Sequence, residues 1–309
     1  VLQQIHRMAE ELCGQLFGSD GEKQCSKIKK LTVVGNTVMC HLFLGQDISG
    51  LTGAPFSSSY NGTFRCYGKD LGWQGWETSE IIVLPGIAAH VGADAAAVMG
   101  AERLWDSEKI QLAIDIGTNA EILFNDHGRI TVCSAAAGPA FEGKGISCGK
   151  RAGKGAVNGV RILRSNGNIL LDVIAEKTSN EVIPEGICGS GLVDAIAQML
   201  HCGVLQSDGY LLSRREAEER GVSGVLCQRL VDNSGQGQCF VLFDPKADRN
   251  MSDGKRITIS QEDIRNFQLA KAAVQAGIQL LLTKKKRTLE QVDQVIVAGV
   301  FGTFLHPDN

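Results

Sequence analysis

The side chains best suited to chemistry in this 309-residue chain lie in a polar turn between two apolar runs, residues 112–116 and 122–124. Such runs around a turn are typical of a β-hairpin. The turn and the strand end before it carry Asp115, Gly117, Thr118 and Asn119. Gly117 is free to take a positive φ, and such a turn can point N–H groups and hydroxyls at a phosphate while the Asp115 carboxylate holds a hydrated Mg²⁺. An ordinary hairpin that carries an aspartate fits this stretch equally well.

The composition is that of an ordinary globular protein, with 43% hydrophobic and 21% charged residues, and its length allows one large domain or two lobes. A net charge of -3 gives no reason to expect nucleic acid as a partner. No apolar run approaches the roughly 20 residues that span a bilayer, and residues 1–20 lack the apolar block of a secretion signal. The ten cysteines form no C-x-x-C pair and are predicted to be mostly reduced, buried thiols in the cytoplasm.

Before the hairpin, apolar spacing predicts a helix over residues 2–16, with Leu2, Ile5, Met8, Leu12 and Leu16 on one face. A buried strand is expected at 32–35, and a helix at 38–44 that Asn36-Thr37 caps. Trp73 and Trp76 are expected to cover part of a core. A further strand at 81–84 precedes a small-residue helix over 90–104, whose first turn carries Asp94.

After the hairpin, a second turn leads to a strand at 129–133, and the glycine-rich stretch 134–155 then carries Glu142. We expect that stretch to be neither rigid nor part of a core. Strands at 157–163 and 169–174 precede a glycine turn and a helix at 192–200. A loop-rich insertion follows at 203–256, with strands near 225–230 and 240–243. A Ser260–Asp263 capping box starts a helix that reaches about residue 282, and the last strand is 294–298. Both chain ends are expected to be cut.

The order of these parts resembles the second half of the actin, sugar-kinase and heat-shock-chaperone ATPase superfamily. Within it the chain is most similar to the ATP-dependent reductive activators of corrinoid proteins. The similarity extends from about residue 31 to the C-terminus and rests on residues 34–39, 85–87, 91–94, 115–119, 136–143, 186–192 and 268–273. Seven stretches in one order are far more specific than a single glycine motif.

The resemblance implies an α/β fold of two ribonuclease-H-like lobes of the actin-like ATPase type, with mixed sheets flanked by helices and truncated at both ends. Residues 1–105 would be the remainder of the first lobe with the connecting helix, and residues 106–309 the second lobe. The implied cofactors are ATP and Mg²⁺, with a [2Fe-2S] cluster on a domain absent from this chain. The implied partner is a corrinoid protein, which the activator reduces from the cob(II) to the cob(I) state for methyl transfer. Neither nucleic acid nor a membrane is expected, and a homodimer is left open.

The resemblance also implies roles for individual residues. Asp115 holds Mg²⁺ through water, and Asp94 and Glu142 are candidates to orient or deprotonate the attacking water; a helix-capping role competes for Asp94. Residues expected at the nucleotide are Gly117, Thr118, Asn119, Gly138, Gly189, Ser190, Gly191, Gly299 and Gly302. For the glycine turn before the helix at 192–200, a flexible cap is the competing interpretation.

Two departures from the family pattern are Val300, where a second glycine is expected beside adenine, and Ala120, where glycine is common. The basic side chains Lys144, Lys150, Arg151 and Lys154 suit either a phosphate clamp, a docking surface for an acidic corrinoid protein, or a solvated loop. The histidines His41, His90 and His306 are expected to be structural. Two other functions remain: a small-molecule kinase acting on a sugar or carboxylate, and a docking domain without catalysis.

Overall fold

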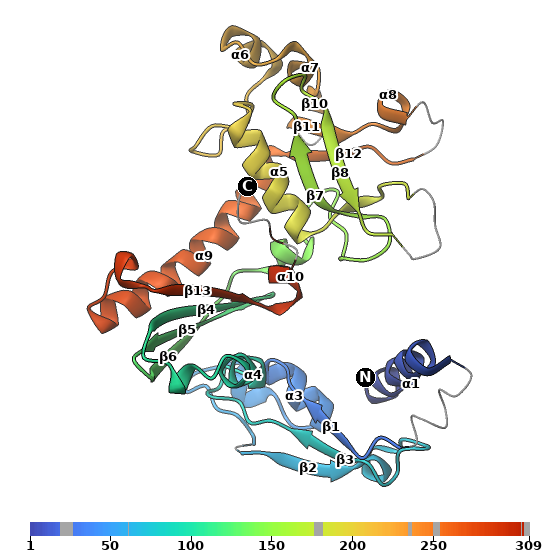
Figure 1. The fold of residues 1–309 in the computed structure, drawn as a ribbon, viewed down its shortest axis with the longest axis vertical. Helices are drawn as coiled ribbons and strands as arrows, with labels where there is room; N and C mark the ends of the chain where they lie inside the picture. The colour runs from blue at the N-terminus through green and yellow to red at the C-terminus, as the bar shows by residue number, and fades with distance from the viewer. Residues whose placement is uncertain are drawn as a thin grey trace. The chain divides into compact units, whose positions relative to one another are not determined.

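The computed structural model of the chain describes residues 1–18, 27–60, 62–175, 182–233, 237–249, 254–303 and 305 (Figure 1). Its contacts divide the chain into two compact units. Unit 1 consists of Val1–Ala113, Leu123–Ser134 and Glu290–Gln294. Unit 2 consists of Ile114–Ile122, Ala135–Leu289 and Val295–Asn309.

Unit 1 contains a three-stranded sheet of order β1-β3-β2, in which β1 is parallel and β2 antiparallel to β3. Its strands are β1 (Lys30–Val33), β2 (Phe64–Tyr67) and β3 (Glu80–Val83). Its helices are α1 (Leu2–Phe17), α3 (Thr37–Leu44) and α4 (Ala93–Ala101), with short 3-10 turns η2 (Ser49–Leu51), η3 (Gly68–Leu71) and η4 (Leu104–Asp106). The predicted cap of α3 is confirmed, since the Asn36 side chain accepts a hydrogen bond from the Met39 N–H and Gly45 ends the helix at φ 63°.

The core of unit 1 gathers around Trp73 and Trp76, which are 2% and 3% exposed, as predicted. Helix α1 packs on this core through Leu2, Ile5, Ala9 and Cys13. The predicted apolar face was therefore only partly right. Met8, Leu12 and Leu16 are exposed, because the residues in contact follow the steps 2, 5, 9 and 13 along the helix.

A four-stranded sheet of order β13-β4-β5-β6 follows, and the division between the units falls within its strand β4, after Ala113. Its strands are β4 (Ile110–Ile116), β5 (Ala120–Asp126), β6 (Arg129–Ala135) and β13 (Gln294–Ala298). The hairpin, the third strand and the last strand are thus confirmed. Short helical segments adjoin β13, η6 (Leu289–Gln291) before it and α10 (Gly299–Thr303) after it.

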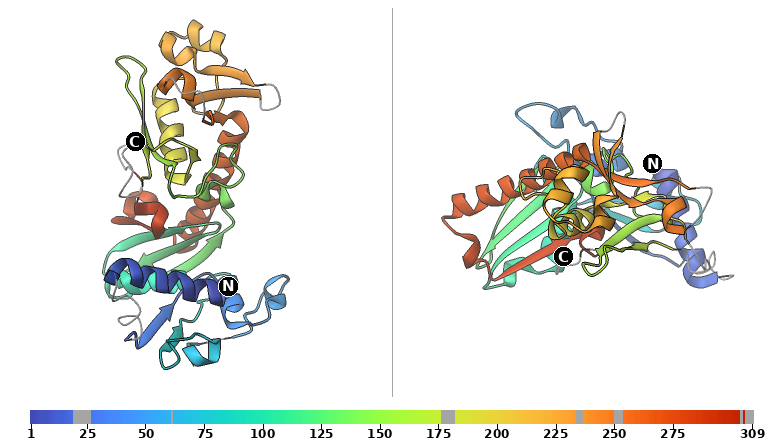
Figure 2. Two further views of the ribbon diagram at one scale, coloured as in Figure 1. Left: turned by 90° about the vertical axis from the view of Figure 1, so that its right-hand side faces the viewer. Right: turned by 90° about the horizontal axis from the view of Figure 1, so that it is seen from above.

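Unit 2 holds two further sheets, of order β8-β7-β9 and β10-β11-β12. Their strands are β7 (Ala156–Ile162), β8 (Ile169–Val173), β9 (Gly186–Ile187), β10 (Leu230–Asn233), β11 (Gly237–Phe243) and β12 (Ile257–Ser260). Its helical segments are η5 (Pro139–Glu142), α5 (Gly189–His201), α6 (Arg214–Glu219), α7 (Gly224–Cys227), α8 (Pro245–Arg249) and α9 (Gln261–Lys285). Figure 2 shows α9 as one long helix, which starts at the predicted Ser260–Asp263 capping box.

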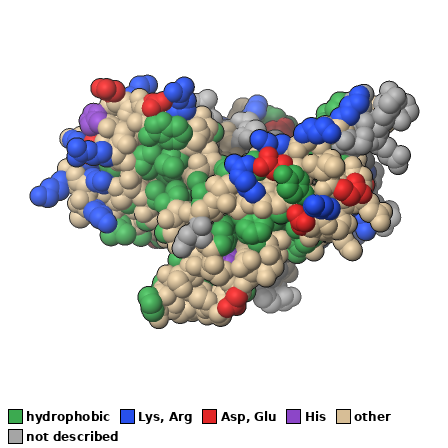
Figure 3. Space-filling view, turned by 90° about the horizontal axis from the view of Figure 1, so that it is seen from below, with side chains coloured by type: hydrophobic (Ala, Val, Ile, Leu, Met, Phe, Trp, Pro, Cys, Tyr) green, Lys and Arg blue, Asp and Glu red, His purple; other side chains and the backbone are tan. Residues whose placement is uncertain are grey.

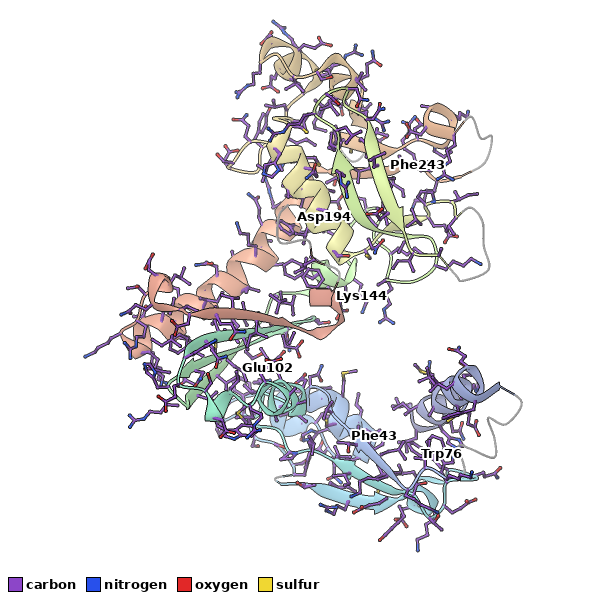
Figure 4. All side chains as sticks on the ribbon, in the orientation of Figure 1. Phe43, Trp76, Glu102, Lys144, Asp194 and Phe243 are labelled. Atoms are coloured by element: carbon purple, nitrogen blue, oxygen red, sulfur yellow. The ribbon has the colours of Figure 1, made fainter. Side chains whose placement is uncertain are left out.

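Helix α5 lies along β7 and completes its hydrogen bonding. Of the residues of β7, only Ala156 and Val157 pair with β9. Farther along, the Val160 N–H donates to the Asp194 carboxylate at 3.3 Å, and the Ile162 N–H donates to the Gln198 amide oxygen at 3.0 Å. Figure 4 labels Asp194 on α5 beside this strand. The buried strand therefore keeps its backbone donors satisfied without a long neighbouring strand.

Four sequence-based expectations were wrong in detail. Strand β1 has exposed and half-buried residues, not the buried ones expected at 32–35. The helix predicted over 90–104 is confined to α4. The strand predicted near 225–230 is the short helix α7, because burial of Leu226 and Cys227 fits either element. The loop 134–155 does contribute to the core, through Ala137, Ala140, Phe141, Ile146 and Cys148.

The cysteines mostly follow the prediction. Cys40, Cys66, Cys133, Cys148, Cys188, Cys202, Cys227 and Cys239 are free thiols, whereas Cys13 is disulfide-bonded. Among the described helices none combines the length and apolar character needed to cross a membrane. Hydrophobic side chains nevertheless form patches on the face drawn in Figure 3.

Replacing Gly191 with alanine tests how α5 docks on β7. A Cβ atom at Gly191 would lie 2.3 Å from the Val157 carbonyl oxygen. This oxygen belongs to the backbone, so it can move away only if the strand itself shifts. We expect Gly191→Ala to lower the free energy of unfolding by about 3 kcal/mol, measured by urea denaturation. Gly100→Ala is the matched control, because this helical glycine has no atom within 4 Å of its Cβ position. It should instead raise stability by up to about 1 kcal/mol. Equal effects at both positions would contradict the close-packing argument.

Candidate functional site

The β4–β5 turn is tight and presents polar side chains to solvent. The Gly117 N–H donates to the Asn119 carbonyl at 2.9 Å, and the side chains of Thr118 and Asn119 are exposed. Gly117 does not use the positive φ that glycine permits. A Cβ at Gly117 would approach the Asn119 oxygen at 3.4 Å, an ordinary contact distance at its lower limit.

Thr118 links this turn to the glycine-rich loop. Its hydroxyl donates to the Glu142 carboxylate at 2.7 Å across 24 residues of sequence. The second carboxylate oxygen of Glu142 faces the Lys144 ammonium at 3.8 Å, and Figure 4 labels Lys144 on this loop. The structure thus brings together two residues that the sequence assigned separately to phosphate binding and to proton transfer.

Asp115 lies at the end of β4, half-buried, with the start of α10 against its carboxylate. Gly299 has φ +82°, and a Cβ there would be 2.7 Å from Asp115 Oδ1. A carboxylate oxygen of Glu121 also lies within 4.8 Å of one from Asp115. Glu121 is only 4% exposed. Sequence reasoning missed it, although its place one residue into β5 puts it opposite the end of β4.

The glycine turn before α5 is explained by backbone packing. A Cβ at Gly189 would stand 1.8 Å from the Phe141 carbonyl oxygen, so only glycine lets η5 and α5 approach. Ser190 is 4% exposed and its hydroxyl donates to the Asn158 carbonyl at 2.9 Å. Together with Gly191, these residues have structural reasons for their identity, and their nucleotide contacts remain predictions.

Two other predicted glycines lie in the same unit. Gly138 precedes η5 at φ +76°, with open space around its Cβ position, and a Cβ at Gly302 would lie 2.7 Å from the Val297 carbonyl oxygen. Of the predicted site residues, only Asp94 belongs to unit 1. The side chain of Val300 is outside the described residues, so the crowding expected there stays a prediction.

Asp94 is held by the turn between β1 and α3. The N–H groups of Ala93 and Asp94 both donate to the Gly35 carbonyl, at 3.0 and 3.3 Å. Gly92 permits this approach, because a Cβ there would lie 2.6 Å from the Asn36 Cα. Burial raises the pKa of the Asp94 carboxyl, and hydrogen bonds from the Ala95 N–H and its own N–H oppose the rise. A raised pKa suits a group that exchanges a proton.

Comparison with known proteins decides the family. Residues 109–309 match the model described as the C-terminal domain of RACo, the ASKHA domain, and residues 1–107 match the RACo middle region. The chain belongs to the RACo family. Its fold is therefore the actin-like ATPase fold, as predicted.

Named relatives of this RACo-family chain agree with the family match. It is 33% identical over 276 residues to the corrinoid activation enzyme RamQ of Eubacterium limosum, covering 89% of this chain and 44% of the relative. It is 31% identical over 205 residues to the [Co(II) methylated amine-specific corrinoid protein] reductase of Methanosarcina barkeri, covering 59% and 38%. A solved reductive activator for corrinoid, iron–sulfur protein superposes with a TM-score of 0.75 at 29% identity, covering 92% of this chain and 46% of that one. The chain thus spans less than half the length of each.

The donor set of the RACo-family site fits a hard cation. Asp115 and Glu121 offer carboxylate oxygens near one another, and oxygen ligands are what Mg²⁺ prefers. Among the described residues no group of three or more cysteines or histidines is placed to hold a metal ion.

The basic residues of the glycine loop differ in their contacts. Lys150 forms an ion pair with Glu185 at 2.6 Å, whereas Arg151 and Lys154 are exposed. Among the histidines, His41 is fully buried: its Nδ1 lies 2.7 Å from the Thr37 carbonyl and its Nε2 accepts from the Ser59 N–H. This confirms a structural role for His41. His90 stacks edge-on against Phe56, and His306 lies outside the described residues.

The raised pKa of Asp94 predicts how its replacement alters stability. Burial disfavours the ionised form of Asp94, so the folded state favours the neutral carboxyl group. The stability that this neutral form contributes is full below the unfolded-state pKa and is lost as pH rises through the folded-state pKa. Asp94→Asn should therefore raise the midpoint of thermal unfolding at pH 7 by about 2 °C. This gain in the unfolding midpoint should vanish near pH 3, where the Asp94 carboxyl group is neutral, as the asparagine side chain is. Circular dichroism melts at the two pH values measure it, and a lower midpoint at pH 7 would contradict the argument.

Proposed function

We propose that this chain is the ATPase module of an activator that reduces a corrinoid protein from the cob(II) to the cob(I) state, the nucleophile needed for methyl transfer. The observation that carries the proposal is the convergence of Asp115, Thr118, Glu142 and Gly299 within unit 2 of an ASKHA domain. The names of the relatives, which refer to corrinoids or corrinoid proteins, supply the substrate class. The proposal includes a cytoplasmic location and an iron–sulfur domain as the source of the electron.

Within this proposal the hairpin binds the nucleotide phosphates. Asp115, with Glu121 behind it, would hold Mg²⁺ through water, and the ion would offset the negative charge of the phosphates when bound. Thr118 and Asn119 would donate to the terminal phosphate. Glu142 or Asp94 would orient the attacking water and accept its proton.

ATP supplies the free energy that the reduction of cobalt(II) requires. Reduction of cobalt(II) in these proteins is unfavourable, so an activator must stabilise a reducible state of its partner. A nucleotide can do this only if its binding or hydrolysis changes the affinity of the activator for the two states of the corrinoid protein. The exposed Arg151 and Lys154 on the glycine loop suit contact with an acidic partner.

The first test follows the cobalt directly. The complete protein, a corrinoid protein, Mg²⁺-ATP and a reductant should convert the visible spectrum from cobalt(II) to cobalt(I). Asp115→Asn should slow this conversion at least about 100-fold, because the carboxylate that orients the ion is lost. A corrinoid spectrum that stays at cobalt(II) with the wild-type protein would refute the proposal.

Two control measurements separate the alternatives. ATP consumption that requires a sugar or carboxylate, and ignores the corrinoid protein, would identify a small-molecule kinase. Absence of heat on titration of the complete protein with Mg²⁺-ATP would identify a docking domain without nucleotide chemistry. A homodimer is tested by sedimentation of the same sample.

Gly299→Ala tests the contact between α10 and Asp115. The substitution strains a backbone at φ +82° and drives a methyl group into Asp115 Oδ1. We expect about a tenfold loss of affinity for Mg²⁺-ATP in isothermal titration, equal to about 1.4 kcal/mol. Gly221→Ala is the matched control, since Gly221 has φ +74° with open space around its Cβ position. Both variants should lose about 1 kcal/mol of stability, but only Gly299→Ala should lose affinity.

A further inference from the structure

Asp263 does more than cap helix α9. Its side chain accepts hydrogen bonds from the Ser260 N–H and hydroxyl, both at 2.8 Å. The Ser260 hydroxyl in turn accepts from the Asp263 N–H at 3.1 Å, which completes the predicted capping box. The Asp263 side chain also accepts from the Ser147 N–H at 2.7 Å and from the Ser147 hydroxyl at 3.0 and 2.9 Å. The carboxylate is 1% exposed, so one buried charge joins the start of α9 to the glycine-rich loop 116 residues earlier.

Every group around this carboxylate is a donor. Two backbone N–H groups and two hydroxyls converge on its two oxygens. Asparagine would offer one oxygen and place an NH₂ group against other donors, leaving buried groups unsatisfied. The two backbone N–H groups, which can only donate, therefore favour a carboxylate over an amide at this position, and the geometry of the site is strongly specified.

The hydrogen bonds at Ser147 fix the closed loop 143–149. The two ends of this loop, which we call its neck, meet beside Glu142. A Cβ at Gly149 would lie 1.8 Å from the Gly143 carbonyl oxygen, so residues 143 and 149 touch through their backbones. The Asn266 amide donates to the Gly145 carbonyl at 2.9 Å, which is a second tie to α9. On the other side of the neck, the ring of Phe141 packs against Phe267 of α9 at 5.9 Å between centroids.

We propose that Asp263 is a positioning residue that, through Ser147, sets the neck of this loop and so holds Glu142 against Thr118. Ile146 and Cys148 anchor the loop in the core, and the side chains of Asp263 and Asn266 that hydrogen-bond to it both come from the first turns of α9. The inference rests on the proposed function, because it places the Glu142–Thr118 pair at the nucleotide. Asp263 acts on that pair through the loop and touches neither member directly.

The test uses Ser147→Ala, which removes the loop's hydroxyl tie and leaves the Ser260 cap of α9 intact. In the complete protein, amide hydrogen exchange of residues 143–149 should become about tenfold faster. The kcat for ATP hydrolysis should fall about tenfold while KM for ATP stays within about twofold, because the loss is one of alignment. Ser147→Thr keeps the hydroxyl and should retain wild-type values, since Ser147 is exposed and has room for a methyl group.

Two further variants distinguish positioning from general stability. Ser213→Ala weakens the capping box of α6 and should lower the melting temperature without changing kcat or the exchange of residues 143–149. In a Glu142→Gln background, Ser147→Ala should add almost no further loss of kcat, because Ser147 acts on kcat only by positioning the Glu142 carboxylate, which this background lacks.

Slow exchange and full kcat in Ser147→Ala, or a loss of kcat that simply multiplies with that of Glu142→Gln, would overturn the inference. If the wild-type protein hydrolyses no ATP, the proposed function fails. The exchange rates of Ser147→Ala and Ser147→Thr then still decide whether Asp263 positions the loop.

Discussion

The candidate site depends on backbone segments that approach more closely than any side chain allows. Phe141 and Gly189, Gly143 and Gly149, and Val157 and Gly191 meet at distances that a Cβ atom would violate. These contacts pack η5, the glycine loop, α5 and β7 into one body with a shared core. Glycine loses more conformational entropy on folding than any other residue. Here that cost is offset, because polar turns lie side by side without intervening side chains.

Much of this arrangement follows from local sequence patterns. The hairpin, the capped helices α3 and α9 and the final strand were predicted because each has periodicity and end signals within a few residues. Asp115 and Thr118 were assigned from a turn whose composition suits phosphate. The Thr118–Glu142 bond was not foreseeable, because its partners are 24 residues apart on elements whose docking depends on the tertiary fold.

The errors have physical causes as well. Gly117 was noted as free to take a positive φ, but the glycines that adopt one lie elsewhere, as at Gly299. The loop 134–155 was judged by its glycine content, whereas Phe141 and Ile146 place it in the core. The buried Glu121 gave no signal beyond strand alternation, since a charged residue in a strand is usually on the solvent face.

The side chains of Asp194 and Gln198 on α5 have a consequence for how the protein behaves before it is fully folded. By occupying the N–H groups of Val160 and Ile162, they close one edge of a short sheet that would otherwise invite another chain to pair with it. A helix that forms quickly from local contacts can thus shield a strand from intermolecular pairing. Protection against aggregation in this region is therefore built into a helix and does not require another strand.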